Sequence, residues 1–159
     1  MTEVNGEGAY LIGEVLRERT EDLDFHALGG LEAGAIPLTT AAVISYHRAG
    51  RSIEGFWVRD KEKAHGTKKL VEGGLVPNSR VVVVEDVVTR GTSALKVIRA
   101  VREMGCEVVR VVALVDRLQG AADVYAAEGV RDYQAVFSIE QFGVKVERPT
   151  PAGTHPTAT

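Results

Sequence analysis

The run from Val81 to Val84 constrains the fold of this chain more than any other segment. Four consecutive β-branched residues are typical of a strand that is covered on both faces, as strands of a parallel sheet are. An apolar pattern with helical spacing follows over 93–104 and is closed by Gly105, and the apolar run 108–115 predicts a second buried strand. Since a strand, a helix and a further strand in this order form a βαβ unit, the sequence predicts an α/β fold.

The remaining apolar patterns continue this alternation. Helices are predicted over 8–20, 34–50 and 121–128, and strands over 25–28 (ending in Gly29-Gly30), 52–58 and 133–137. A long basic loop over 59–78 has room for one more short strand. We therefore expect a single domain over 1–146, with a parallel β-sheet and helices on both faces. Residues 147–159 are rich in Pro, Thr, Ala and Gly and are predicted to form a disordered tail.

Composition limits the class of partner. The chain has 159 residues and a net charge of −3, so general attraction to nucleic acid or to an anionic membrane is not expected. One cysteine, Cys106, excludes an internal disulfide and fits a reducing cytoplasm. The sequence shows neither an N-terminal signal pattern nor an apolar run long enough to cross a bilayer. The expected location is the cytoplasm.

Two adjacent acids, Glu85 and Asp86, follow the valine run, and the small-residue loop 89–93 comes directly after them. Ligands of parallel sheets bind beyond the carboxyl ends of the strands, and a glycine with hydroxyl groups at a helix N-terminus suits a phosphate monoester. Carboxylates would repel that phosphate unless they contact another part of the ligand, and the vicinal hydroxyls of a ribose fit this role. The competing interpretation is a helix capped by Thr92 or Ser93, with two ordinary loop acids before it.

These segments resemble the motifs of a known family. VVVVEDVVTRGTS (81–93) resembles the signature with which type I phosphoribosyltransferases bind phosphoribosyl pyrophosphate (PRPP). The similarity is closest to orotate phosphoribosyltransferases, in VRDKEKAHGTKKLVEG (58–73), VDRLQGA (115–121) and GGLEAGAIPL (29–38). It extends over about 8–144 and implies a type I phosphoribosyltransferase core, which transfers ribose 5-phosphate from PRPP to orotate in pyrimidine nucleotide synthesis.

The resemblance also implies a role for each matching residue. The PRPP-binding residues would be Arg59, Lys63, His65, Glu85, Asp86, Thr89, Arg90, Gly91, Thr92 and Ser93. Within this set the acids would hold the ribose hydroxyls, the loop 89–93 the 5-phosphate, and the basic residues the pyrophosphate. Lys63, His65 and Asp86 would be catalytic, and Arg117 would bind the carboxylate of the base. Mg²⁺ would arrive with the pyrophosphate rather than on protein ligands, and the family's shared mobile loop implies a homodimer.

Three features depart from the family pattern. Asp60 stands where the family has a lysine, so it is expected to pair with Lys61 or Lys63 or to help hold the metal. Arg90 replaces a small residue of the phosphate loop, and no segment matches the N-terminal hood that helps to form the base site. These departures leave open a different base, or a non-catalytic regulator that senses PRPP. Each assignment also has a non-functional alternative. Residues 59–69 could be a solvated basic loop, and Arg117 could be a surface arginine or pair with Asp116.

Overall fold

The computed structural model of the chain describes residues 5–60 and 70–146. Its helices are α1 (Gly6–Glu18), α2 (Ala35–Arg48), α3 (Thr92–Glu103), α4 (Ala121–Ala127) and the 3-10 helix η2 (Ile139–Phe142). Its strands are β1 (Ala27–Leu31), β2 (Glu54–Val58), β3 (Val71–Gly73), β4 (Arg80–Val88), β5 (Glu107–Asp116) and β6 (Tyr133–Ser138). The predicted helices and strands are all present, and η2 is an addition that the apolar pattern did not predict.

The six strands form one sheet in the order β3-β2-β1-β4-β5-β6. All neighbouring pairs are parallel except β2 and β3, which are antiparallel. From β1 the chain builds outward through α2 to β2, and from β4 it builds in the opposite direction through α3 to β5. The boundary between β1 and β4 is therefore a topological switch point, where open parallel sheets bind their ligands.

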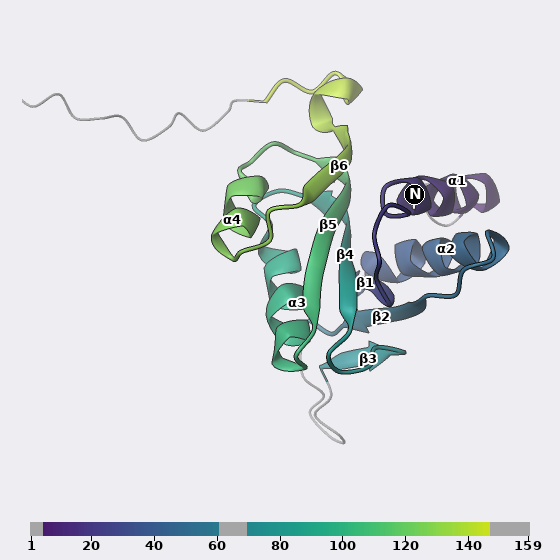
Figure 1. Ribbon diagram of the computed structural model, residues 1–159. Coiled ribbons are helices and arrows are strands. Elements are labelled where there is room, and N and C mark those ends of the chain that lie inside the picture. The colour runs from purple at the N-terminus through teal and green to yellow at the C-terminus, as the bar shows by residue number, and fades with distance from the viewer. Residues whose placement is uncertain (1–4, 61–69, 147–159) are drawn as a thin grey trace, which may run out of the picture.

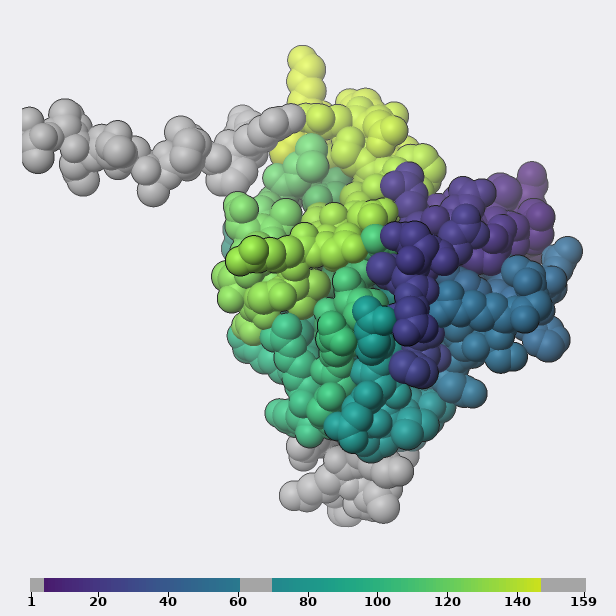
Figure 2. Space-filling view, in the orientation of Figure 1, coloured from purple at the N-terminus to yellow at the C-terminus, as the bar shows by residue number. Residues whose placement is uncertain are grey.

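Helices cover both faces of the sheet, which confirms the predicted architecture. Helices α1 and α2 lie on one face, and α3 and α4 lie on the other (Figure 1). Along β4 the side chains alternate, so that Val81 and Val83 join the core under α3 while Val82 and Val84 join the core under α2. In the space-filling view the first two helices form one side of the molecule in purple and blue, opposite the green segments of α3 and α4 (Figure 2). Within the described ranges no helix combines the length and the apolar character that crossing a membrane requires.

Strand β1 runs through the two glycines that were expected to end it. A Cβ atom at Gly29 would lie 2.0 Å from the carbonyl oxygen of Phe56, and one at Gly30 would lie 2.1 Å from that of Val84. Only glycine allows the neighbouring strands to approach this closely. The two glycines therefore allow β1 to pack closely against its neighbouring strands, and they also lie in the segment that leads to the switch point.

Candidate active site

The two predicted acids lie inside β4 rather than after it, because the strand continues to Val88. At the switch point they line a pocket of about 150 Å³ between the end of β1, the start of α2 and the start of α3. The pocket is lined by Leu31, Glu32, Gly34, Ala35, Val84, Glu85, Asp86, Val87 and Ser93. Three of these residues are acidic, so the pocket suits a ligand that offers hydroxyl groups rather than an anion.

Glu85 is a buried carboxyl group with one unsatisfied oxygen. Its residue is only 7% exposed, and Oε1 has no hydrogen-bond partner among the residues that the structure describes. Burial, and then the charge of Asp86, raise the pKa of Glu85 to about 7. Near neutral pH this carboxyl group exists both with and without its proton, so a hydroxyl-bearing ligand would meet a group able to accept or to donate a hydrogen bond.

Asp86 points to the other side of the strand, towards the N-terminus of α2. Its Oδ1 accepts a hydrogen bond of 2.7 Å from the backbone N–H of Val87. A Cβ atom at Gly34 would lie 2.9 Å from the Asp86 carboxylate, so the glycine leaves the space that this side chain occupies. The carboxylate is therefore held by local backbone and by shape, with its second oxygen available to a ligand.

The loop 89–93 begins helix α3 without a side-chain cap. Gly91 is the N-cap residue, with a φ of 78°, and no side chain makes a capping hydrogen bond. The competing interpretation, a helix capped by Thr92 or Ser93, is therefore wrong. Because the first-turn N–H groups have no side-chain acceptor, this helix end retains donors and partial positive charge for an anion.

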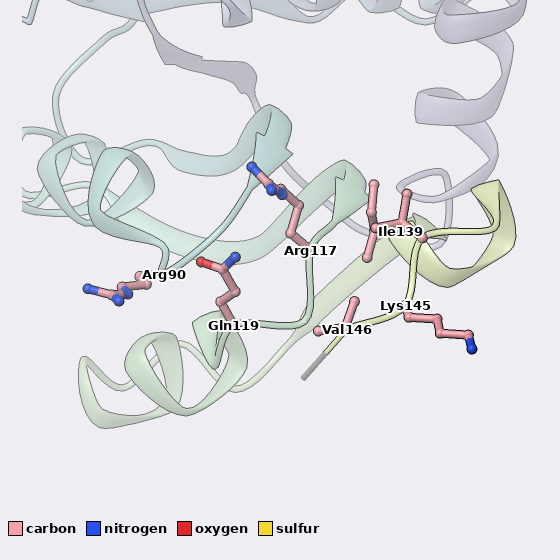
Figure 3. A pocket seen from close by; sticks show the side chains of 7 residues that line it. Arg90, Arg117, Gln119, Ile139, Lys145 and Val146 are labelled. Carbon is pink, nitrogen blue, oxygen red and sulfur yellow. The ribbon is translucent and has the colours of Figure 1, made fainter. Parts of the chain in front are cut away.

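A second pocket, of about 410 Å³, borders the same loop at Arg90. It is lined by Arg90, Arg117, Gln119, Ile139, Val144, Lys145 and Val146. Arg117 and Gln119 come from the segment after β5, Arg90 comes from the loop 89–93, and the remainder comes from η2 and the residues after it (Figure 3). Three cationic residues line this pocket and none of its lining residues is acidic, in contrast to the first pocket. The structure thus separates the acids from the cations that the sequence places close together.

The end of β2 carries the first residues of the predicted pyrophosphate segment. Arg59 Nε donates to Glu72 Oε1 at 3.1 Å, and the backbone N–H of Asp60 donates to Glu32 Oε1 at 3.3 Å. Asp60 Oδ1 pairs with Lys96 Nζ of α3 at 2.5 Å, a partner that the sequence did not indicate. Lys61, Lys63 and His65, for which pairing or pyrophosphate contact was predicted, lie outside the described residues.

Sequence reasoning missed several residues that border the two pockets. Glu32 and Gly34 belong to the segment 29–38, and Gln119 belongs to 115–121, so both motifs contained the signal although no role was assigned to these positions. Tyr125 of α4 also reaches the loop, since a Cβ atom at Gly91 would lie 2.7 Å from its ring. Nothing in the local pattern of α4 could have indicated that contact.

Comparison with known proteins agrees with this geometry. The family model described as phosphoribosyl transferase domain matches residues 28–147. An orotate phosphoribosyltransferase of Mycobacterium tuberculosis is 46% identical over 134 residues, which are 84% of this chain and 73% of that protein. One from Streptomyces avermitilis is 43% identical over 141 residues, or 89% of this chain and 78% of that protein.

Solved structures give the same result. The crystal structure of M. tuberculosis orotate phosphoribosyltransferase in complex with PRPP has a TM-score of 0.77 and 40% identity, and the match covers 90% of this chain and 80% of that one. A phosphoribosyltransferase from Corynebacterium diphtheriae has a TM-score of 0.80 and 43% identity, covering 90% and 82%. The family model and these relatives cover most of the chain, so this protein belongs to the phosphoribosyltransferase family, and the two relatives compared by sequence are orotate phosphoribosyltransferases.

Proposed function

We propose that this protein transfers the ribose 5-phosphate group of PRPP to orotate, forming orotidine 5′-phosphate and pyrophosphate. The observation that carries the proposal is the loop 89–93, which borders an acidic pocket at Ser93 and a cationic pocket at Arg90. PRPP fits this arrangement, because the ribose hydroxyls of PRPP suit the acids and its 5-phosphate suits the uncapped start of α3. The 43–46% identity to orotate phosphoribosyltransferases supports the same substrate pair.

The reaction joins N1 of orotate to C1 of the ribose as the bond from C1 to the pyrophosphate oxygen breaks, and the proton of N1 is released to water. The electron pair of that bond leaves with pyrophosphate, and positive charge develops on the sugar. Asp86 and Glu85 would hold the ribose hydroxyls and favour that positive charge. Thr89, Arg90, Gly91, Thr92 and Ser93 would hold the 5-phosphate. These groups fix the sugar while the bond to the base forms.

The charge that builds up on pyrophosphate requires cations. Arg59 directly follows β2. The next residue, Asp60, donates its backbone N–H to Glu32 of the acidic pocket, which places Arg59 near that pocket. Lys63 and His65 are assigned to pyrophosphate on family resemblance, since they lie outside the described residues. Arg117 in the cationic pocket would bind the carboxylate of orotate, and a guanidinium suits that group because it can donate two parallel hydrogen bonds.

Mg²⁺ is proposed to bind together with PRPP. The family resemblance assigns its ligands to pyrophosphate and ribose oxygens, which are of the type that Mg²⁺ prefers. In the part of the chain that the structure describes, no group of three metal-ligating side chains is placed to hold a metal ion. The carboxylates of Glu32 and Asp86 are of the type that Mg²⁺ prefers and line the adjacent pocket. When bound, the ion offsets negative charge on the leaving pyrophosphate. The proposal includes a homodimer that acts in the cytoplasm. Sedimentation of the purified protein measures whether it is a dimer.

Asp60 favours one alternative, a non-catalytic protein that senses PRPP, because an acid replaces a lysine near the pyrophosphate. A base screen with PRPP and Mg²⁺ distinguishes the possibilities, with pyrophosphate release followed for orotate, uracil and adenine. We expect release with orotate alone, accompanied by loss of its ultraviolet absorbance. Release with another base would reassign the substrate, whereas PRPP binding without release from any base would support the sensor.

A further inference from the structure

Lys96 of α3 reaches across the fold to the end of β2. Its Nζ pairs with Oδ1 of Asp60 at 2.5 Å, and the backbone N–H of the same Asp60 donates to Oε1 of Glu32 at 3.3 Å. Glu32 is one of the residues that line the acidic pocket. A single residue, Asp60, therefore connects the ammonium group of Lys96 to the wall of that pocket.

The position of Lys96 along its own helix gives a second, independent indication of the same place. Ser93 lines the acidic pocket, and Lys96 follows it three residues later in α3. Residues with this spacing are neighbours on one face of a helix. A contact across the fold and the spacing along the helix thus both place Lys96 beside the acidic pocket.

The charges around this pocket are unfavourable for an anion. Glu32, Glu85 and Asp86 line it, and none of the described residues that line it is a cation. Asp60 adds a further acid at the end of β2, where the pyrophosphate of PRPP is assigned. A carboxylate in that place repels pyrophosphate unless a cation lies beside it, and Lys96 supplies such a cation.

The pair between Lys96 and Asp60 is suited to a change of partner. Both side chains are about half exposed, so the pair contributes little to stability and a ligand can reach the ammonium group from solvent. A lysine carries three donors on a flexible stem, and its hydrogen bonds to phosphate oxygens are charge-assisted. Lys96 can therefore donate to a phosphate oxygen at little cost to the fold.

We propose that Lys96 is a pyrophosphate-binding residue of the active site. Its ammonium group donates to a pyrophosphate oxygen of PRPP, and Asp60 holds it at the rim of the acidic pocket until the ligand binds. The inference rests on the PRPP-binding part of the proposed function. It adds a cation that lies outside the basic segment 59–69 and comes from a different element of the fold.

Calorimetry in the presence of Mg²⁺ tests this role with PRPP and with ribose 5-phosphate, which lacks the pyrophosphate. Lys96→Met should lose roughly tenfold in affinity for PRPP, the effect of one charge-assisted hydrogen bond, and less than twofold for ribose 5-phosphate. Lys96→Arg keeps the charge and should retain most of the PRPP affinity. Arg99→Met is the matched control, because Arg99 is an exposed cation of the same helix that pairs with Glu128, and neither residue lines the acidic pocket. It should bind both ligands as wild type does.

A second comparison separates contact with the ligand from simple neutralisation of Asp60. In the variant Asp60→Asn the rim has lost its extra negative charge, and the amide oxygen can still accept from Lys96. Adding Lys96→Met to this variant should again reduce PRPP affinity by roughly tenfold if the ammonium group contacts pyrophosphate. If the loss seen in wild type disappears in this background, Lys96 acts only on Asp60 and the inference is wrong.

The remaining outcomes separate this inference from the proposed function. If wild type binds PRPP and Lys96→Met binds it equally well, the role of Lys96 is wrong and the proposed function stands. An equal loss for ribose 5-phosphate, or an equal loss in Arg99→Met, would also overturn the role, since it would show a general effect on the site. If wild type does not bind PRPP, the proposed function and the inference are both wrong.

Discussion

The two pockets that border the loop 89–93 are built in different ways. The acidic pocket is formed by strand residues and helix starts at the switch point, and Glu85 in it is buried to 7% exposure. The cationic pocket is formed by exposed side chains such as Arg90 and Arg117, together with the segment after η2. The half of the site assigned to the ribose hydroxyls is thus part of the sheet, whereas the half around Arg117, assigned to the base, lies on its surface.

This difference predicts how substitutions act. A change in the acidic pocket should alter both folding stability and PRPP affinity, because the same atoms belong to the core and to the site. A change in the cationic pocket should alter the choice of base with little effect on stability, because surface side chains have few neighbours to disturb.

The largest effect is expected from Glu85→Gln, measured as a difference in pH dependence. The pKa of Glu85 rises from its ordinary 4.5 to about 7 in the folded protein, so the folded state holds a proton that the unfolded state has released. Wild type should therefore lose roughly 3 kcal/mol of unfolding free energy as the pH rises from 4.5 to 7, and the variant should not show this loss.

Urea unfolding at pH 4 and pH 8 measures that difference. Glu103→Gln, which removes an exposed carboxyl group from the end of α3, is the control for the loss of one charge. Identical pH profiles for wild type and Glu85→Gln would show that the carboxyl group is not destabilised by burial, and the contrast between the pockets would disappear.

Asp86→Asn should reduce PRPP affinity by about 10- to 100-fold, because a hydrogen bond to a charged group contributes about 1.5–3 kcal/mol. The amide keeps the shape that Gly34 accommodates and keeps an oxygen that can accept from Val87. Calorimetry with PRPP and Mg²⁺ measures the loss, and Asp123→Asn on the exposed side of α4 is the control. Unchanged affinity would exclude Asp86 from the ribose site.

Arg117→Gln should raise the KM for orotate by about tenfold, the effect of losing one charge-assisted contact. The affinity for PRPP, measured separately by calorimetry, should change less than twofold because the acidic pocket is intact. Arg131→Gln removes an exposed arginine that lines neither pocket and serves as the control. A larger loss for PRPP than for orotate would reverse the assignment of the two pockets.

The smallest effect is expected at the ion pair between Asp60 and Lys96. Both side chains are about half exposed, at 46% and 56%, and exposed pairs contribute less than about 1 kcal/mol. A double-mutant cycle with Asp60→Asn and Lys96→Met, measured by urea unfolding, should give a coupling energy within that limit. A coupling well above it would mean that the end of β2 is anchored as firmly as the acidic pocket.

The order of strands and helices was predictable because it depends on local patterns. Four valines predict a buried strand wherever they occur, and the repeat over 93–104 predicts a helix without knowledge of its neighbours. Strand ends were less predictable. Gly29 and Gly30 are unfavourable for an isolated strand, and only the close approach of Phe56 and Val84 explains why β1 includes them.

The candidate site was predictable as far as its residues are contiguous in the sequence. The paired acids and the loop 89–93 lie within one segment, and Glu85, Asp86 and Ser93 of that segment line the pocket at the switch point. Contacts between distant segments were not predictable. Asp60 pairs with Lys96 across 36 positions, and Tyr125 reaches Gly91 from a different helix.

The sequence by itself determined the βα repeats, the acidic pair and the glycine-containing loop, because each depends on neighbours along the chain. Only the tertiary structure decided that Glu85 is buried with an unpaired oxygen, that the acids and the cations face different pockets, and that Tyr125 lies beneath the loop. The reason is that the order of strands in the sheet sets these distances. Side chains that are far apart along the chain meet where β1 and β4 pair, and the spacing of residues does not encode that pairing.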